Sequence, residues 1–261
     1  MRGTTIIPRM FKVLRHIPTT VAVLIFMISS AHAETFTVFT NSVPPIKFVE
    51  DNKLRGVAGE ILDALLRRTN HNVDTVIALP LKAAYEQVRL TKNSICPALG
   101  RTPQREKHFK WVGPVYSTRF GLIVKKSRFE ELKQVNSSDL IVGSVAHSVP
   151  EQKYREKFPS RNVHKIPSTA QAIRQLSDNT IDILVFALTP AFHLIAHEGL
   201  DPHDFVVLNE IDSVDLYIAF NLGTSDLIIQ QFQDALEDMK RSDDKDNEYS
   251  RIISRYFVPS L

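Results

Sequence analysis

Short stretches of alternating or continuous apolar residues recur along the chain, separated by stretches in which apolar residues follow a helical spacing. Residues 35–40 (TFTVFT) alternate and are rich in β-formers, which predicts a strand. Residues 59–70 place Ile and Leu at helical intervals and end in Asn, which predicts a helix after a turn-rich loop. A second strand (72–79), a second helix (82–92) and a third strand (94–100) follow. This alternation predicts βαβ units and a parallel sheet.

The same alternation begins again in the second part of the chain. Pro150 fits the first turn of a helix, Ser168 fits an N-cap, and Gly199 fits a helix end. The pattern therefore predicts two successive α/β units, the second followed by a strand and two helices that can return to the first. We predict further strands at 120–127, 140–146, 181–188 and 216–222, and further helices at 150–158, 168–178, 190–199, 225–242 and 246–257.

The first 33 residues differ from the rest of the chain in composition. Residues 1–20 carry four basic side chains and no acidic one, and an eight-residue apolar run, VAVLIFMI, follows. Ala31 and Ala33 then form a small-x-small cleavage site. An apolar run of this length is too short to span a bilayer, which takes roughly 20 residues. We therefore predict a cleaved secretory signal peptide over residues 1–33.

Removal of this leader leaves a chain close to neutrality. The chain has 32 basic and 29 acidic residues, and four of the basic residues lie in the leader. The remaining balance gives no reason to expect nucleic acid or an anionic membrane as a partner. Cys96 is the single cysteine, so no intramolecular disulfide forms, and we expect it to be a buried apolar residue. Export without disulfides is typical of a bacterial periplasm.

Five stretches, taken in order, resemble the family 3 extracellular solute-binding proteins, which include the polar amino acid receptors of ABC transporters. The stretches are PPIKFVEDNKLRGVAGEILDAL, TPQREKHFKWVGPVY, LIVGSVAHSVPEQ, DNTIDILVFAL and IISRYF. The resemblance covers essentially residues 34–261, and it implies an α/β periplasmic binding protein of type II. Such a protein has two lobes, two hinge strands and a ligand cleft between the lobes. The implied boundaries are 34–117 and 218–261 for lobe 1, 121–214 for lobe 2, and hinges near 117–120 and 215–217.

A Thr-x-x-Arg stretch carries the most specific functional signal of this resemblance. In the family its Arg pairs with the α-carboxylate of the ligand, and here it corresponds to Arg105, with Thr102 three residues before it. A guanidinium presents two parallel donors to a carboxylate. Its place just after the predicted strand 94–100 aims it at the crevice where open α/β sheets bind ligands. The neighbouring Arg101 either supplies a second positive charge or points to solvent.

Ser148 is the candidate that lobe 2 contributes to the cleft. It lies just before Pro150, at the start of a predicted helix whose free N–H groups and dipole favour an anion. The same serine is also suited to capping that helix, and the two roles are compatible.

Several positions that shape the ligand site in the family are changed here. The acid that pairs with a ligand ammonium in amino acid receptors falls on Ala187. The two aromatic positions are Val43 and Leu81, and the hydroxyl positions before Thr-x-x-Arg are Ala98 and Gly100. The carboxylate anchor is therefore kept while the ammonium partner and the aromatic walls are lost.

These changes favour a carboxylate ligand that is not a standard α-amino acid. Alternatively, the ligand carries an amine that pairs with another acid, such as Glu60 or Asp212. Glu60, however, also suits the N-terminus of its own predicted helix. A degenerate site without a small ligand is a further alternative. The expected function is hinge closure around a small carboxylate, by a monomer that serves an ABC-type importer. A periplasmic sensor that presents its ligand to a receptor is the alternative to transport.

Catalysis is the competing class of function, because a few relatives of this fold are dehydratases. His193 and His197 lie four residues apart on a predicted helix, but no third metal ligand lies near them in the sequence. Neither a HExxH nor a GxSxG motif occurs. We therefore predict no catalytic residue, no cofactor and no metal.

Overall fold

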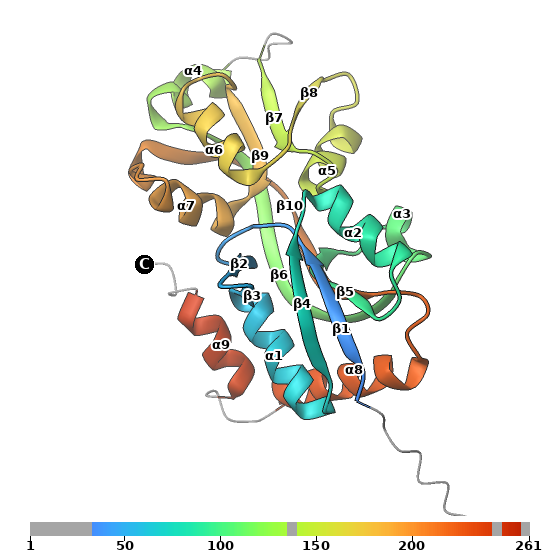
Figure 1. The fold of residues 1–261 in the computed structure, drawn as a ribbon. Helices are drawn as coiled ribbons and strands as arrows, with labels where there is room; N and C mark the ends of the chain where they lie inside the picture. Colours follow the sequence, from blue (N-terminus) through green and yellow to red (C-terminus); the bar gives the residue numbers. More distant parts are fainter. Residues whose placement is uncertain (1–32, 135–139, 242–246, 257–261) are drawn as a thin grey trace, which may run out of the picture. The chain divides into compact units, whose positions relative to one another are not determined.

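The computed structural model describes residues 33–134, 140–241 and 247–256 (Figure 1). The predicted signal peptide lies outside the described residues, apart from Ala33. The residues from Ala33 onward form one unit by their contacts. Among the described residues, no helix combines the length and the hydrophobicity that crossing a membrane requires.

The first part of the chain folds largely as its pattern predicts. The central strand β1 pairs in parallel with β4 on one side and β5 on the other. Within the predicted loop after β1, however, β2 and β3 form a small antiparallel ribbon. The elements are β1 (Thr35–Thr40), β2 (Phe48–Glu50), β3 (Lys53–Arg55), α1 (Val57–Thr69), β4 (Asn72–Ala78), α2 (Leu81–Leu90), β5 (Ser94–Gly100) and α3 (Pro103–Glu106).

The middle of the chain forms a second set of parallel strands, in which β7 pairs with β8 and with β9. The Oγ of Ser168 accepts a hydrogen bond from the N–H of Gln171, so the predicted N-cap of α6 is confirmed. Strand β8 and helix α4 were not predicted. The elements are α4 (Phe129–Gln134), β7 (Val142–Val145), α5 (Val149–Lys157), β8 (Val163–Ile166), α6 (Thr169–Ser177), β9 (Ile183–Ala187) and α7 (Leu188–His197).

Two long antiparallel strands, β6 (Lys110–Lys125) and β10 (Phe205–Phe220), join the two sets of elements. Strand β10 also pairs with β5, and β6 also pairs with β9. The predicted strands 120–127 and 216–222 are therefore too short. Charged and turn-forming residues interrupt the apolar pattern of both segments, and pairing with each other holds them extended. The complete sheet has the order β4-β1-β5-β10-β6-β9-β7-β8.

Helices α8 (Asp226–Arg241) and α9 (Glu248–Tyr256) return to the first set of elements, where both pack against α1. We call β1–β5 with α1–α3, α8 and α9 the first half, and β7–β9 with α4–α7 the second half. Figure 1 shows β6 and β10 running from one half to the other. This arrangement confirms the predicted α/β fold with two lobes and two joining strands. The numbered lobe boundaries stay a prediction.

Each half has its own apolar core. The core of the first half includes an aromatic group in which Phe36 meets Phe220 and Phe232 edge to face. The second half packs α6 and α7 on one face of its strands and α5 on the other. Cys96 is fully buried among apolar neighbours, as predicted.

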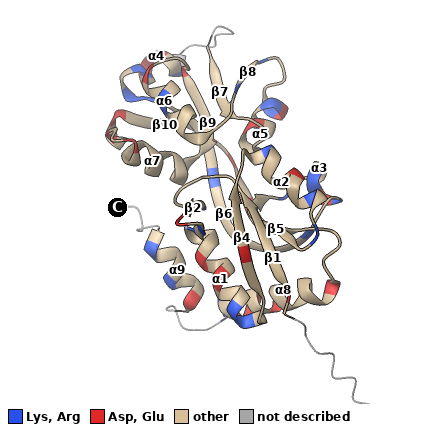
Figure 2. Ribbon diagram, in the orientation of Figure 1, with Lys and Arg blue, Asp and Glu red and all other residues tan. Residues whose placement is uncertain are grey.

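Charged residues of both signs are mixed over the helices, whereas the strands β1, β5, β7 and β9 carry none (Figure 2). This mixture fits the near-neutral balance found in the sequence. A charge that lies inside the protein therefore stands apart from the general pattern and calls for an explanation.

Candidate ligand-binding site

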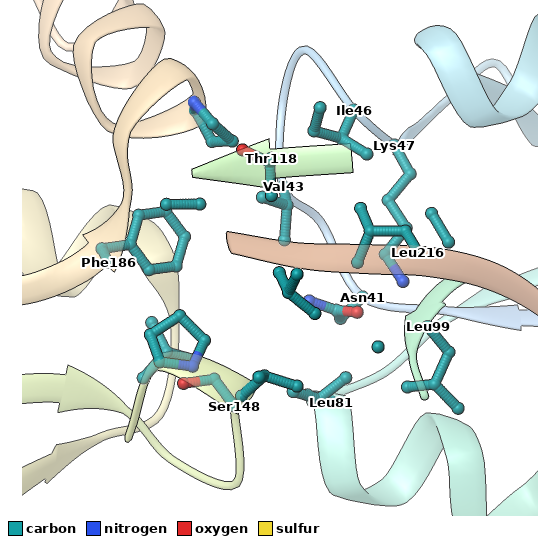
Figure 3. A pocket seen from close by; sticks show the side chains of 18 of the residues that line it. Asn41, Val43, Ile46, Lys47, Leu81, Leu99, Thr118, Ser148, Phe186 and Leu216 are labelled. Carbon is teal, nitrogen blue, oxygen red and sulfur yellow. The ribbon is translucent and has the colours of Figure 1, made fainter. Parts of the chain in front are cut away.

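A pocket of about 90 Å³ lies where the two halves meet the joining strands (Figure 3). Most of its wall is aliphatic, with Phe186 as its one aromatic side chain among the described residues. Six residues predicted for the ligand site line it, namely Val43, Leu81, Gly100, Arg105, Ser148 and Ala187. The other lining residues are Asn41, Ile46, Lys47, Ala98, Leu99, Thr118, Val145, Val149, Pro150, Thr169, Phe186, Pro190, Val214 and Leu216.

Arg105 is held firmly at the edge of this pocket. It lies on the single-turn helix α3, directly after β5, and is 9% exposed. Its Nη1 donates to the carbonyl of Gly100 at 2.9 Å and its Nη2 to the carbonyl of His147 at 2.7 Å. Its guanidinium lies 4.7 Å from the ring centre of Tyr85. Burial lowers the pKa of Arg105, and the nearby Tyr85 opposes that shift.

Arg101 does not line the pocket. Its Nε donates to Glu106 at 2.7 Å, and its guanidinium packs over the rings of Trp111 and Tyr217. Together with Thr102 it lines a separate cavity of about 340 Å³. Of the two alternatives for Arg101, the structure favours an outward-facing side chain. The predicted ligand-binding roles of Arg101 and Thr102 thus find no support in their position.

Ser148 caps helix α5 and also lines the pocket. Its Oγ accepts from the N–H of Glu151 at 3.2 Å. The Glu151 carboxylate in turn accepts from the N–H of His147 at 2.6 Å and binds Arg155 at 3.0 Å. These bonds fix the loop that presents the His147 carbonyl to Arg105. Ser148 therefore lies where both a capping role and a ligand-binding role require it. Its hydrogen bond with Glu151 shows the capping role directly.

Gly100 and Ala187 are small residues at the pocket wall. A Cβ atom added to Gly100 would be 2.5 Å from Cγ2 of Val149, which belongs to the second half. Ala187 is the N-cap residue of α7 and is 8% exposed. It therefore borders the pocket with a methyl group at the position where amino acid receptors of the family carry an acid.

Four polar residues of the pocket were not predicted, namely Asn41, Lys47, Thr118 and Thr169. Asn41 directly follows β1 and is 9% exposed, and its Oδ1 is buried without a hydrogen-bond partner among the described residues. Lys47 is 3% exposed, and its Nζ donates to the carbonyl of Pro97 at 2.8 Å. Burial lowers the pKa of Lys47, and the charge of Arg105 lowers it further.

Neither acid considered as an ammonium partner reaches the pocket. Glu60 accepts from Tyr256 at 2.6 Å and binds Arg255 at 2.7 Å, so it joins α1 to α9. Asp212 lies on β10 and lines the separate cavity beside Arg101. In the described part of the chain, the pocket wall thus holds two cationic side chains and no carboxylate.

The histidine pair on α7 does not form a metal centre with a third ligand. Burial lowers the pKa of His193, and the nearby His197 lowers it further. Within the described ranges, no three His, Cys, Asp or Glu side chains gather closely enough to hold a metal ion.

The sheet order, the two joining strands and a pocket between two separate cores define a two-lobed periplasmic binding protein. The chain belongs to the bacterial extracellular solute-binding proteins, family 3, whose model matches residues 37–259. No curated protein matches the chain. The family is described as one of solute-binding proteins, which favours a binding protein over an enzyme.

Three solved structures of similar fold have 15–22% sequence identity to the chain. An ancestral arginine-binding protein bound to glutamine has a TM-score of 0.70 and 22% identity, over 85% of this chain and 97% of that chain. A histidine kinase sensor domain with similarity to periplasmic binding proteins has 0.73 and 15%, over 86% and 96%. An ancestral amino acid-binding protein, a precursor of cyclohexadienyl dehydratase, has 0.70 and 21%, over 85% and 95%.

Proposed function

We propose that this protein captures a small carboxylate-bearing solute in the pocket, with Arg105 as the anchor for the carboxylate. The observation that carries this proposal is the placement of the Arg105 guanidinium. It is nearly buried, its two Nη atoms bond to backbone carbonyls, and its face rests on Tyr85. A fixed guanidinium with no carboxylate on the described pocket wall is suited to receive a carboxylate from a ligand.

Capture proceeds by closure of the two lobes about β6 and β10. Three hydrogen bonds support this mechanism because they join the first half to the second. They are Arg105 to the carbonyl of His147, Gln152 to Gln104 at 2.9 Å, and Thr169 to the carbonyl of Ser42 at 3.4 Å. Closure excludes water, which strengthens the pairing of Arg105 with an anion.

The ligand carries no ammonium group that needs an acidic partner. Ala187 and the absence of a carboxylate from the described wall support this part of the proposal. The pocket volume of about 90 Å³ also favours a short ligand. A cavity of about 150 Å³ accommodates benzene, so we expect a solute of about six non-hydrogen atoms or fewer in this conformation.

The cellular role that follows is capture after export. A signal peptide over residues 1–33 directs the chain to the periplasm, where the monomeric protein delivers its solute to an ABC permease. Lobe 1 comprises 34–117 and 218–261, and lobe 2 comprises 121–214. The family and the sequence of the leader support these assignments.

A sensor that presents its ligand to a receptor is the second candidate role. The similarity to a histidine kinase sensor domain favours it, because that domain uses the same fold. Enzymatic function has weaker support. One similar structure is a precursor of a dehydratase, but the described pocket wall holds no His, Asp or Glu that could act as a general acid or base.

A thermal-shift screen tests the proposed function. Amino acids, short monocarboxylates, hydroxy acids, keto acids, dicarboxylates and short peptides are added to the wild type and to Arg105→Ala. A ligand at a hundred times its dissociation constant should raise the melting temperature of the wild type by roughly 5–10 °C. Arg105→Ala should not respond. No stabilisation by any carboxylate, or equal stabilisation of the variant, contradicts the proposal.

A further inference from the structure

We propose that Asn41 and Lys47 form a second polar subsite that binds a hydroxyl group, so that the solute is a short hydroxy acid. This inference rests on the proposed function, because Arg105 holds the carboxylate of the same molecule. The subsite lies in the same pocket, on the side formed by the first half. Figure 3 shows the amine of Lys47 and the amide of Asn41 directed toward the same part of the pocket.

Asn41 carries an acceptor that the protein leaves unused. Its Oδ1 is buried without a partner among the described residues, although the side chain lines the pocket. Buried polar atoms nearly always have a hydrogen-bond partner. Asn221 is the matched example, since its Oδ1 accepts from Gly223 at 2.8 Å and its Nδ2 donates to Val88 at 2.7 Å. The contrast points to a donor supplied from outside the chain.

Lys47 supplies donors to the same pocket. An ammonium has three N–H donors, and in the described part of the chain Lys47 uses one of them, toward Pro97. The amine is almost completely buried and lines the pocket together with Arg105. A lysine buried without an acidic partner is rare, and it is costly unless a ligand completes its bonds.

A hydroxyl is the group that serves both side chains. Its oxygen accepts from Lys47 while its hydrogen is donated to Oδ1 of Asn41. A ligand ammonium would donate to Asn41 but would face the positive charge of Lys47. A second carboxylate would accept from Lys47 but would place an oxygen against Oδ1 of Asn41. The volume of about 90 Å³ favours an acid with a short chain.

Calorimetry with lactate, propionate and malonate tests the subsite. Lactate differs from propionate only by its hydroxyl, and malonate differs from propionate by a second carboxylate in place of its methyl group. The wild type should bind lactate at least about tenfold more tightly than propionate, because a site built around a hydroxyl rejects the analogue that lacks it. Lactate should also bind more tightly than malonate.

Two variants assign the preference to the subsite. Asn41→Leu should reduce the preference for lactate over propionate to within about twofold, since no acceptor remains for the hydroxyl. Lys47→Met should weaken lactate more than propionate. Lys240→Met is the control, because Lys240 is a half-buried lysine that also bonds to a proline carbonyl, that of Pro114, outside the pocket. Both acids should bind this control as they bind the wild type.

The outcomes separate the subsite from the anchor. Equal binding of lactate and propionate by the wild type, lost in Arg105→Ala, overturns the subsite and leaves the anchor in place. Tighter binding of malonate overturns the hydroxyl assignment in favour of a second carboxylate. An unchanged preference in Asn41→Leu also overturns it, provided that the variant melts as cooperatively as the wild type. Binding of none of the three acids overturns the subsite, and the carboxylate anchor falls with it only if no carboxylate in the thermal-shift screen binds either.

Discussion

The two walls of the pocket differ in charge, although both are largely aliphatic. The wall from the first half carries Asn41, Lys47 and Arg105. The wall from the second half carries Ser148 and Thr169 as its polar side chains, and no charged residue among those described. This difference supports the proposal that the first half binds the solute through charge and that the second half closes over it as a neutral cover.

The walls also differ in how far their polar groups are already bonded. On the second half, Ser148 accepts from Glu151, and Glu151 is bonded to His147 and Arg155. That network holds its own loop and leaves little for a ligand. On the first half, Asn41 has an acceptor without a partner among the described residues. Unused bonding capacity is thus a better guide to the binding wall than polarity alone.

The largest effect should come from removal of the anchor. Arg105→Ala should weaken carboxylate binding by about 2–5 kcal/mol, which is roughly thirty-fold to several thousand-fold, because a buried charge pair loses one partner. Arg105→Lys should also bind poorly, because an ammonium lacks the two parallel donors. Calorimetry with the carboxylate found in the screen measures both losses.

Arg101→Ala is the matched control, since Arg101 is four residues away but bonds to Glu106 outside the pocket. Its affinity should stay within about twofold of the wild type, as for a solvated surface ion pair. Equal losses in the Arg101 and Arg105 variants would mean that general charge, and not a fixed anchor, holds the ligand.

The second largest effect should come from a methyl group that separates the two walls. Gly100→Ala places Cβ 2.5 Å from Cγ2 of Val149, so the walls can meet only after Val149 shifts. We expect about tenfold weaker binding and less compaction in small-angle scattering, because overpacking typically costs 1–3 kcal/mol. Adding Val149→Ala should restore much of the affinity. No rescue would show that the contact between these two residues does not limit closure.

A smaller effect should follow when the neutral wall receives a charge. Ala187→Asp introduces an acid at the N-cap of α7, on the wall that carries none. Binding of α-amino acids relative to hydroxy acids should improve by about threefold to tenfold, since the new carboxylate attracts an ammonium and repels an additional anion. Ala187→Asn supplies a similar cap without the charge. The same gain in both variants would assign the effect to the helix cap.

The smallest effect concerns the stability of the empty protein. Lys47→Met should raise the free energy of unfolding by about 1 kcal/mol near neutral pH, because burial disfavours the charged amine. Since burial lowers the pKa of Lys47 below its ordinary 10.5, wild-type stability rises with pH between the lowered value and 10.5. The gain in the variant should therefore shrink in that range. Urea titrations at several pH values measure it, and a gain that grows with pH contradicts this explanation.

Local patterns predicted most of the parallel strands and helices, because each has a clear period of apolar residues. They failed for the joining strands β6 and β10, whose extended form depends on pairing between segments far apart in the sequence. The small ribbon of β2 and β3 was missed for another reason, because strands of three residues are too short to show an alternating pattern.

The site was predicted in part. The Thr-x-x-Arg motif led to Arg105, but it left open whether Arg101 also faces the ligand, because packing decides which side chains around the short helix α3 turn inward. A lysine in a loop is normally solvated, so Lys47 gave no signal of burial. Asn41 was recognisable in principle, because it lies at the carboxyl end of β1, where α/β sheets bind ligands.

In the proposed function, the pocket binds a carboxylate and offers no partner for an ammonium among the described residues. The most direct measurement is calorimetry of lactate against alanine, which share a carbon skeleton and differ in the hydroxyl and ammonium groups. Lactate should bind at least about tenfold more tightly, because the ammonium of alanine would meet the charge of Lys47 without a compensating acid. Alanine that binds as tightly as lactate, or more tightly, would contradict the claim.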